Sequence, residues 1–180
     1  MARARPYTRL DADLPDSYIS RVEFNDWLLA LHLLSAFAFV GAIIVFSVAV
    51  VAIRRTDLPE QVLAVARLLP VANVVVVVGS LGAIIFGVWL AIALDGIKVW
   101  NGWVIAAIVL WAVASEAGRR SDPEYAPCIE RAKELVAAGQ TGPDSQLQEL
   151  ARTSKGNMLH WLATVLALLI LVDMIWKPGA

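Results

Sequence analysis

The chain has 180 residues, of which 59% are apolar and 17% are charged. Water-soluble domains are typically about 45–50% apolar and about 25% charged, so the composition excludes an ordinary soluble domain and indicates a membrane protein. The net charge of -1 excludes the basic excess of a nucleic-acid binder, and the single cysteine, Cys128, excludes an internal disulfide and a cysteine-rich metal site.

The first 26 residues are polar and contain no apolar run, so they do not form a cleavable secretory signal. We expect residues 1–26 to be a polar tail outside the membrane domain. The rest of the chain, residues 27–177, is expected to be one membrane domain, followed by a short end at 178–180.

Four stretches contain enough uncharged residues to cross a bilayer, which takes about 20 apolar residues in a helix. Their limits predict spans at about 27–53, 71–94, 101–117 and 157–176. A span in lipid must satisfy its own backbone hydrogen bonds, and no alternating barrel pattern is present, so each span is predicted to be helical. The fold class is therefore all-α, a four-transmembrane-helix bundle.

Small residues recur at one-turn intervals in the second span, at Gly79, Ala83 and Gly87. Such a stripe lets the backbone of another helix approach closely, so we interpret it as a helix-packing surface.

Two connectors join the spans on one side of the membrane. In the first, Asp57 and Glu60 have the spacing of a capping box at the start of a short helix. The second, residues 118–156, has apolar residues at helical spacing, and Ser145 with Gln148 again resembles a helix cap. This segment is predicted to be an amphipathic helical connector in the cytosol, and its alternative role is docking of a soluble partner.

Lysine and arginine number nine on the connector side and six on the side of the two termini. Cytoplasmic loops of membrane proteins are enriched in these residues. We therefore expect a multi-pass protein of the bacterial inner membrane with both termini outside.

Polar residues inside spans are the default functional candidates. Toward the termini these are His32, Asp173 and Met174, and toward the connectors Asn73, Glu116 and His160. They fit a small proton- or metal-linked transporter. The alternative for the two acids is neutralisation by basic residues one turn along the helix, Lys177 for Asp173 and both Arg119 and Arg120 for Glu116.

Two histidines in a membrane bundle suggest a haem with two axial ligands, but His32 and His160 are predicted to lie roughly 18 Å apart along the membrane normal. One haem cannot bind both. The pair at matching depth is His32 with Met174, a His/Met axial set that would suit haem b in a redox carrier.

No nucleophile with a matching base, phosphate loop or zinc-protease spacing is present in the sequence. The preferred interpretation is a non-enzymatic component or accessory of a larger membrane assembly. Its partners are then the lipid bilayer and either other membrane subunits or further copies of the chain.

Several features occur in one order along the chain: Leu31-His32 with Gly41 in the first span, Gly79 to Gly87 followed by Trp89-Leu90 in the second, a tryptophan-bearing third span ending in basic residues, a long helical connector, and Lys177-Pro178. This pattern resembles a bacterial integral-membrane family called domain of unknown function 2269, from about Trp27 to Pro178. The resemblance implies a four-helix membrane protein and no particular activity.

The early histidine of the first span is also distantly similar to the copper-resistance protein D group. That similarity would imply copper binding through His32. The chain lacks the Met-rich or His-rich ligand sets that copper handling favours.

Overall fold

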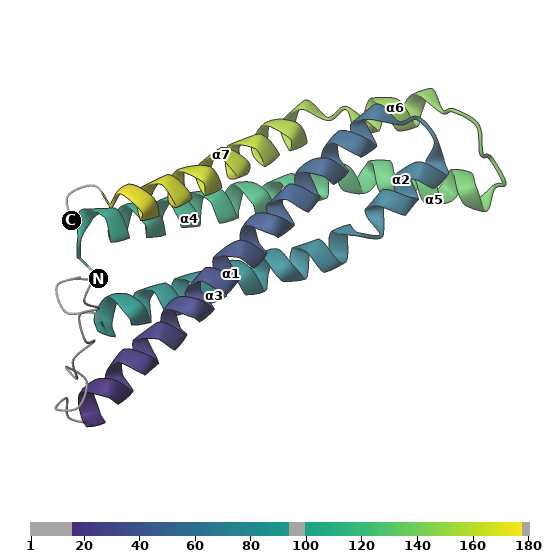
Figure 1. The fold of residues 1–180 in the computed structure, drawn as a ribbon. Helices are drawn as coiled ribbons and strands as arrows, with labels where there is room; N and C mark the ends of the chain where they lie inside the picture. Colours follow the sequence, from purple (N-terminus) through teal and green to yellow (C-terminus); the bar gives the residue numbers. More distant parts are fainter. Residues whose placement is uncertain (1–15, 94–99, 178–180) are drawn as a thin grey trace, which may run out of the picture.

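A computed structural model describes residues 16–93 and 100–177. Figure 1 shows that these residues form a bundle of long helices with shorter helices at one end. The long helices are α1 (Asp16–Arg55), α3 (Leu69–Ala93), α4 (Gly102–Ser121) and α7 (Ser154–Trp176). The shorter elements are α2 (Pro59–Ala66), the 3-10 helix η2 (Asp122–Tyr125), α5 (Ala126–Ala137) and α6 (Ser145–Ala151).

The four long helices are apolar and long enough to cross a membrane. No strand occurs in the ranges 16–93 and 100–177. The predicted all-α bundle with four membrane helices is therefore confirmed. Three segments of the sequence prediction lie outside the described residues: residues 1–15 of the tail, the turn at 94–99 and the end at 178–180.

The first helix begins earlier than the sequence suggested, because α1 starts at Asp16, within the expected tail. In the sequence, the loss of charged residues marks the edge of the lipid. It does not mark the start of the helix, because a helix can extend into water with charged residues on its surface. In this extension the ring of Phe24 lies 5.7 Å from the ring of Trp89 on α3, edge to face. The polar N-terminal segment is thus partly a continuation of the first spanning helix.

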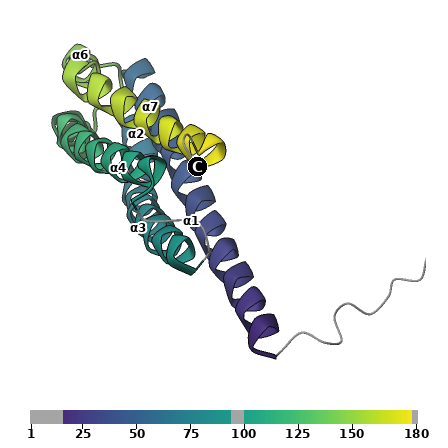
Figure 2. The same ribbon diagram turned by 90° about the vertical axis from the view of Figure 1, so that its left-hand side faces the viewer.

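The long helices form two pairs, α1 with α3 and α4 with α7, and contact between the pairs is far less extensive. Gly79 of α3 faces α1 so closely that a Cβ atom there would meet the backbone of α1, and a Cβ atom on Gly82 would meet the side chain of Ser35. Figures 1 and 2 show the N-terminal half of α1 diverging from α7. The two pairs therefore meet mainly toward the connector end of the bundle.

The connectors fold into a small hydrophobic core that joins the two pairs. Its buried residues come from the end of α1 and from α2, α5 and α6: Ile53, Val62, Cys128, Ala132, Leu135, Leu147 and Ala151. The amphipathic pattern of the second connector thus packs against the rest of the protein, since α5 lies against α2 and α6.

The helix caps of the connectors differ from the expected ones. Leu58 is the N-cap of α2, and no side chain caps this helix. At α6 the cap is Asp144, whose carboxylate accepts a hydrogen bond of 2.7 Å from the backbone N–H of Leu147. Asp144 therefore takes the capping position that the sequence assigned to Ser145, because a carboxylate oxygen accepts this hydrogen bond as well as a serine hydroxyl does.

Candidate intramembrane cavity

A cavity of about 480 Å³ lies between the two helix pairs. All four long helices contribute to its wall, together with η2 and Ile129 of α5. On α1 the lining runs from Phe39 to Ile53, which corresponds to about 20 Å along the helix at 1.5 Å per residue. The cavity thus extends from the connector end over more than half of a hydrocarbon core of about 30 Å.

The wall changes in character along its length. Its deep part is mostly apolar and includes Phe39, Val77 and Leu81, and the Ser80 hydroxyl there donates a hydrogen bond to the backbone oxygen of Val77. Toward the connector end the wall contains polar and charged groups: Asn73, Ser115, Arg119, Ser121, Asp122, Tyr125 and His160. The cavity is therefore amphipathic, with its polar part at the end that the connectors cover.

His160 enters the cavity from α7. Its Nε2 atom lies 3.1 Å from the hydroxyl oxygen of Ser47 on α1, so this contact bridges the two helix pairs. The His160 side chain is buried, and its ring packs edge to face on Trp161 at 5.7 Å. Of the polar residues that the sequence singled out, His160 and Asn73 are the two that line the cavity.

Trp111 of α4 also lines the cavity, near its middle. Its indole nitrogen is buried and has no hydrogen-bond partner within 16–93 and 100–177. A buried donor without an acceptor is unfavourable, and in a membrane no bulk water compensates for it. Surrounding protein atoms enclose this nitrogen, so Trp111 faces the cavity with other parts of its ring.

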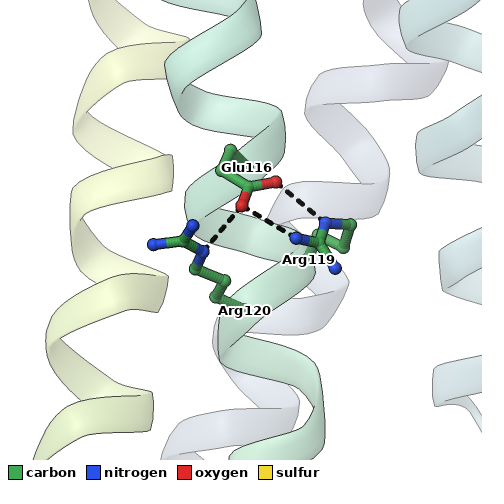
Figure 3. Close-up of polar contacts among 3 residues, drawn as sticks. All are labelled: Glu116, Arg119 and Arg120. Carbon is green, nitrogen blue, oxygen red and sulfur yellow. Dashed lines mark hydrogen bonds and ion pairs between the residues drawn. The ribbon is translucent and has the colours of Figure 1, made fainter.

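Glu116 lies outside the cavity wall and belongs to an ion-pair cluster on α4. Arg119 donates two hydrogen bonds of 2.8 Å to its carboxylate, and Arg120 donates one of 2.6 Å, as Figure 3 shows. The predicted neutralisation of Glu116 by the two arginines is confirmed. Its role in this structure is to hold the guanidinium groups at the end of α4.

His32 occupies a different place, against α3. Its Nδ1 atom lies 2.8 Å from the backbone oxygen of Ala83, and a Cβ on Gly87 would lie 2.9 Å from the imidazole ring. The stripe formed by Gly79, Ala83 and Gly87 therefore faces α1, and Gly87 makes room for His32.

The two histidines are far apart in the structure. Ser47, the neighbour of His160, follows His32 by 15 residues on α1, which corresponds to about 22 Å. Met174 lies on α7, from which the half of α1 that carries His32 diverges in both views. The structure brings His32 neither to His160 nor to Met174, and no cluster of three metal-binding side chains occurs in the part of the chain described.

Asp173 is buried near the end of α7, and its expected ion pair with Lys177 does not form. Lys177 ends the helix in the left-handed region, with a φ of 43°, so its side chain leaves the helical face of Asp173. Its ammonium nitrogen lies instead 5.7 Å from the centre of the Trp103 ring. One carboxylate oxygen of Asp173 has no hydrogen-bond partner among the residues described.

The family comparison covers the helices that build this site. A family described as "predicted integral membrane protein (DUF2269)" matches residues 26–178. The chain belongs to this family. No curated protein and no solved structure matches the chain, so the distant similarity to the copper-resistance protein D group stays a hypothesis.

In this DUF2269 protein the sequence identified some cavity residues and missed others. Asn73 and His160 were found because polar residues inside a span are conspicuous. Trp111, Ser80 and Ser115 were missed, since tryptophan and serine are ordinary in membrane helices. The signal that could have grouped Trp111 and Ser115 is their common helical face with Ala114 and Gly118 on α4, but only the packing of α4 against α7 shows that this face borders a cavity.

Proposed function

We propose that this DUF2269 protein is a non-enzymatic component of a larger membrane assembly and that its part there is to hold a small amphipathic molecule in the interhelix cavity. The observation that carries the proposal is the amphipathic wall, apolar in its deep part and polar at the connector end. The volume of about 480 Å³ falls within the about 300–1,000 Å³ of typical small-molecule pockets.

The chemistry of the wall supports binding rather than catalysis. The His160 ring is already engaged with Ser47, and other polar side chains such as Asn73 and Ser115 line the same end of the cavity. Such polar groups orient a ligand through hydrogen bonds, and the apolar wall contributes the burial of its hydrocarbon part.

A blocked cavity tests this function. Ala163 lines the cavity, so Ala163→Phe should fill part of it, whereas Ala112→Phe adds the same volume on an exposed face of α4. Native mass spectrometry from a neutral detergent should detect a bound amphiphile on the wild type and on Ala112→Phe, with strong loss on Ala163→Phe. Equal occupancy of all three proteins, or an empty wild type, would overturn the proposal.

The limited contact between the helix pairs supports the assembly part of the proposal, because it leaves helix surface for other membrane subunits or further copies of the chain. Trp27, Trp100 and Trp176 are also strongly exposed toward the ends near the termini. Cross-linking in intact membranes, followed by mass measurement, should yield complexes larger than one chain. A single uncross-linked species would contradict this part alone.

A small proton- or metal-linked transporter is the second candidate, and the position of His160 in the cavity favours it. In that case His160→Gln should abolish a substrate-dependent current in liposomes, and Trp161→Phe, on the neighbouring exposed position, should preserve it. A haem b or copper redox carrier has no such support, because His32 and Met174 lie on helix segments that diverge.

We further propose that the connectors lie in the cytosol of a bacterial cell, with both termini on the other side of its inner membrane. The basis is the excess of lysine and arginine on the connector side. In a Cys128→Ala background, the exposed thiol introduced by Lys155→Cys should react with a membrane-impermeant reagent only after the membrane is opened. Reaction in sealed cells would reverse this orientation.

A further inference from the structure

The interhelix cavity lies next to a groove between α2 and α5. The two spaces share Leu69, Asn73, Asp122 and Ile129 on their walls. The groove is open at the surface of the connectors, and we call it the mouth of the cavity.

Cations predominate on the wall of the cavity and its mouth. Arg67 and Lys133 line the groove and Arg119 lines the cavity, whereas Asp122 is the acid present on both walls. Since the charges lie at the polar end and not along the apolar part, they match a molecule with a negative head and a hydrocarbon tail.

These cations differ in how far they are already paired. Arg119 binds Glu116, and Lys133 lies 2.8 Å from Glu130, but both pairs are exposed and such pairs contribute little. Arg67 belongs to none of the ion pairs within 16–93 and 100–177. A headgroup can therefore bind Arg67 directly and recruit Lys133 from a weak partner.

We propose that the cavity and its mouth bind one phospholipid with an anionic headgroup, which places its phosphate at Arg67 and Lys133 and an acyl chain along Phe39, Val77 and Leu81. The inference rests on the proposed binding function and specifies its ligand. Basic pockets between membrane helices are typical sites for anionic lipid heads, and arginine binds phosphate oxygens through charge-assisted hydrogen bonds. The acyl chain lies in the apolar part of the cavity, where its burial contributes to affinity.

The ligand test is a competition between two lipids with identical acyl chains. The full-length protein in a neutral detergent is mixed with equal amounts of phosphatidylglycerol, which is anionic, and phosphatidylcholine, which is zwitterionic, and adducts are counted by native mass spectrometry. The wild type should retain one phosphatidylglycerol in clear preference. Arg67→Gln should reduce that preference about tenfold, because one of the positive charges that disfavour the choline ammonium of phosphatidylcholine is lost.

Two variants serve as controls. Arg55→Gln removes an exposed arginine at the end of α1 that lines neither the cavity nor the groove, and it should keep the wild-type preference. Ala163→Phe should lose both lipids, because it blocks the chain rather than the head.

The outcomes separate the ligand class from the function. Equal binding of the two lipids by the wild type, with loss of both on Ala163→Phe, would overturn the anionic specificity and leave the proposed binding function standing. No adduct of either lipid would overturn both. Displacement of the lipid by inorganic phosphate at equal concentration would show that the acyl chain contributes nothing, and would overturn the phospholipid as ligand.

Discussion

A Cβ atom on Gly79 of α3 would lie 2.7 Å from the backbone nitrogen of Phe39 on α1. At this distance the backbones of the two helices are in direct contact, and no side chain can be accommodated by a rotamer change. Helix association in lipid depends on such close packing, because hydrocarbon offers no hydrophobic driving force between helices.

Gly79→Ala should therefore destabilise the α1/α3 pair, by about 1–3 kcal/mol as for other overpacked sites. The matched control is Gly41→Ala on α1, because Gly41 is exposed and has no neighbouring atom within 4 Å of an added Cβ. Thermal unfolding in neutral detergent measures both, and Gly41→Ala should be neutral or slightly stabilising. Equal midpoints for the two variants would show that the helices are not packed in this register.

Gly87→Ala tests the contact between α3 and His32. The new methyl group would lie 2.9 Å from the imidazole ring and displace it from the Ala83 oxygen. The expected loss is about 0.5–1.5 kcal/mol for the hydrogen bond.

A double-mutant cycle separates this effect from a general disturbance of the helix. In a His32→Ala background, Gly87→Ala should cost nothing or gain stability, since alanine favours a helix over glycine. An unchanged cost in that background would show that the ring is not the neighbour that limits this position.

The fold was predictable because charge and apolar length alone decide where a chain crosses lipid. The four spans follow from this rule, and so does the Glu116 cluster, since residues three and four apart on a helix always meet. The start of α1 at Asp16 was not predictable in this way, because a polar segment next to a span can be either a continuation of the helix or a tail.

The candidate site was predictable only in part, because a cavity depends on how helices pair. The sequence identifies Gly79, Ala83 and Gly87 as a packing stripe but not α1 as the helix that meets it. It likewise gives Asp173 and Lys177 the spacing of an ion pair, and the left-handed conformation of Lys177 removes that contact. Helix pairing is a tertiary feature that a single sequence does not encode locally, and the spacing of Asp173 and Lys177 does not by itself show where the helix ends.

Acidic pH should weaken the second connector through Asp144. The N–H of Leu147 donates to its carboxylate and Arg131 lies 3.2 Å away, and both hold the pKa of Asp144 below its usual range. A group with a lowered pKa stabilises the fold above its unfolded-state pKa, and this contribution is lost as the pH falls through the folded-state pKa.

Asp144→Asn should remove that dependence, because asparagine still caps the helix but carries no charge. The unfolding midpoints of the wild type and Asp144→Asn should therefore converge as the pH falls from about 7 to about 3. Glu149→Gln, at an exposed carboxylate on the same helix, is the control and should keep the pH dependence of the wild type. A constant difference between the wild type and Asp144→Asn would contradict the role of the charge.

Leu147→Ala should loosen the connector core that joins the helix pairs. The side chain of Leu147 is fully buried among Ile53, Val62 and Cys128, so its truncation leaves a cavity and should cost about 2–5 kcal/mol. Val136→Ala on α5 removes a similar apolar group from an exposed position and should change stability by no more than about 0.5 kcal/mol.

Because Cys128 is itself buried in this core, its reaction with a thiol reagent gives a local readout. Leu147→Ala should label much faster than the wild type under native conditions, and Val136→Ala should label at the wild-type rate. Fast labelling of the wild type would mean that the connector core is open, and that the two helix pairs are held together by other contacts.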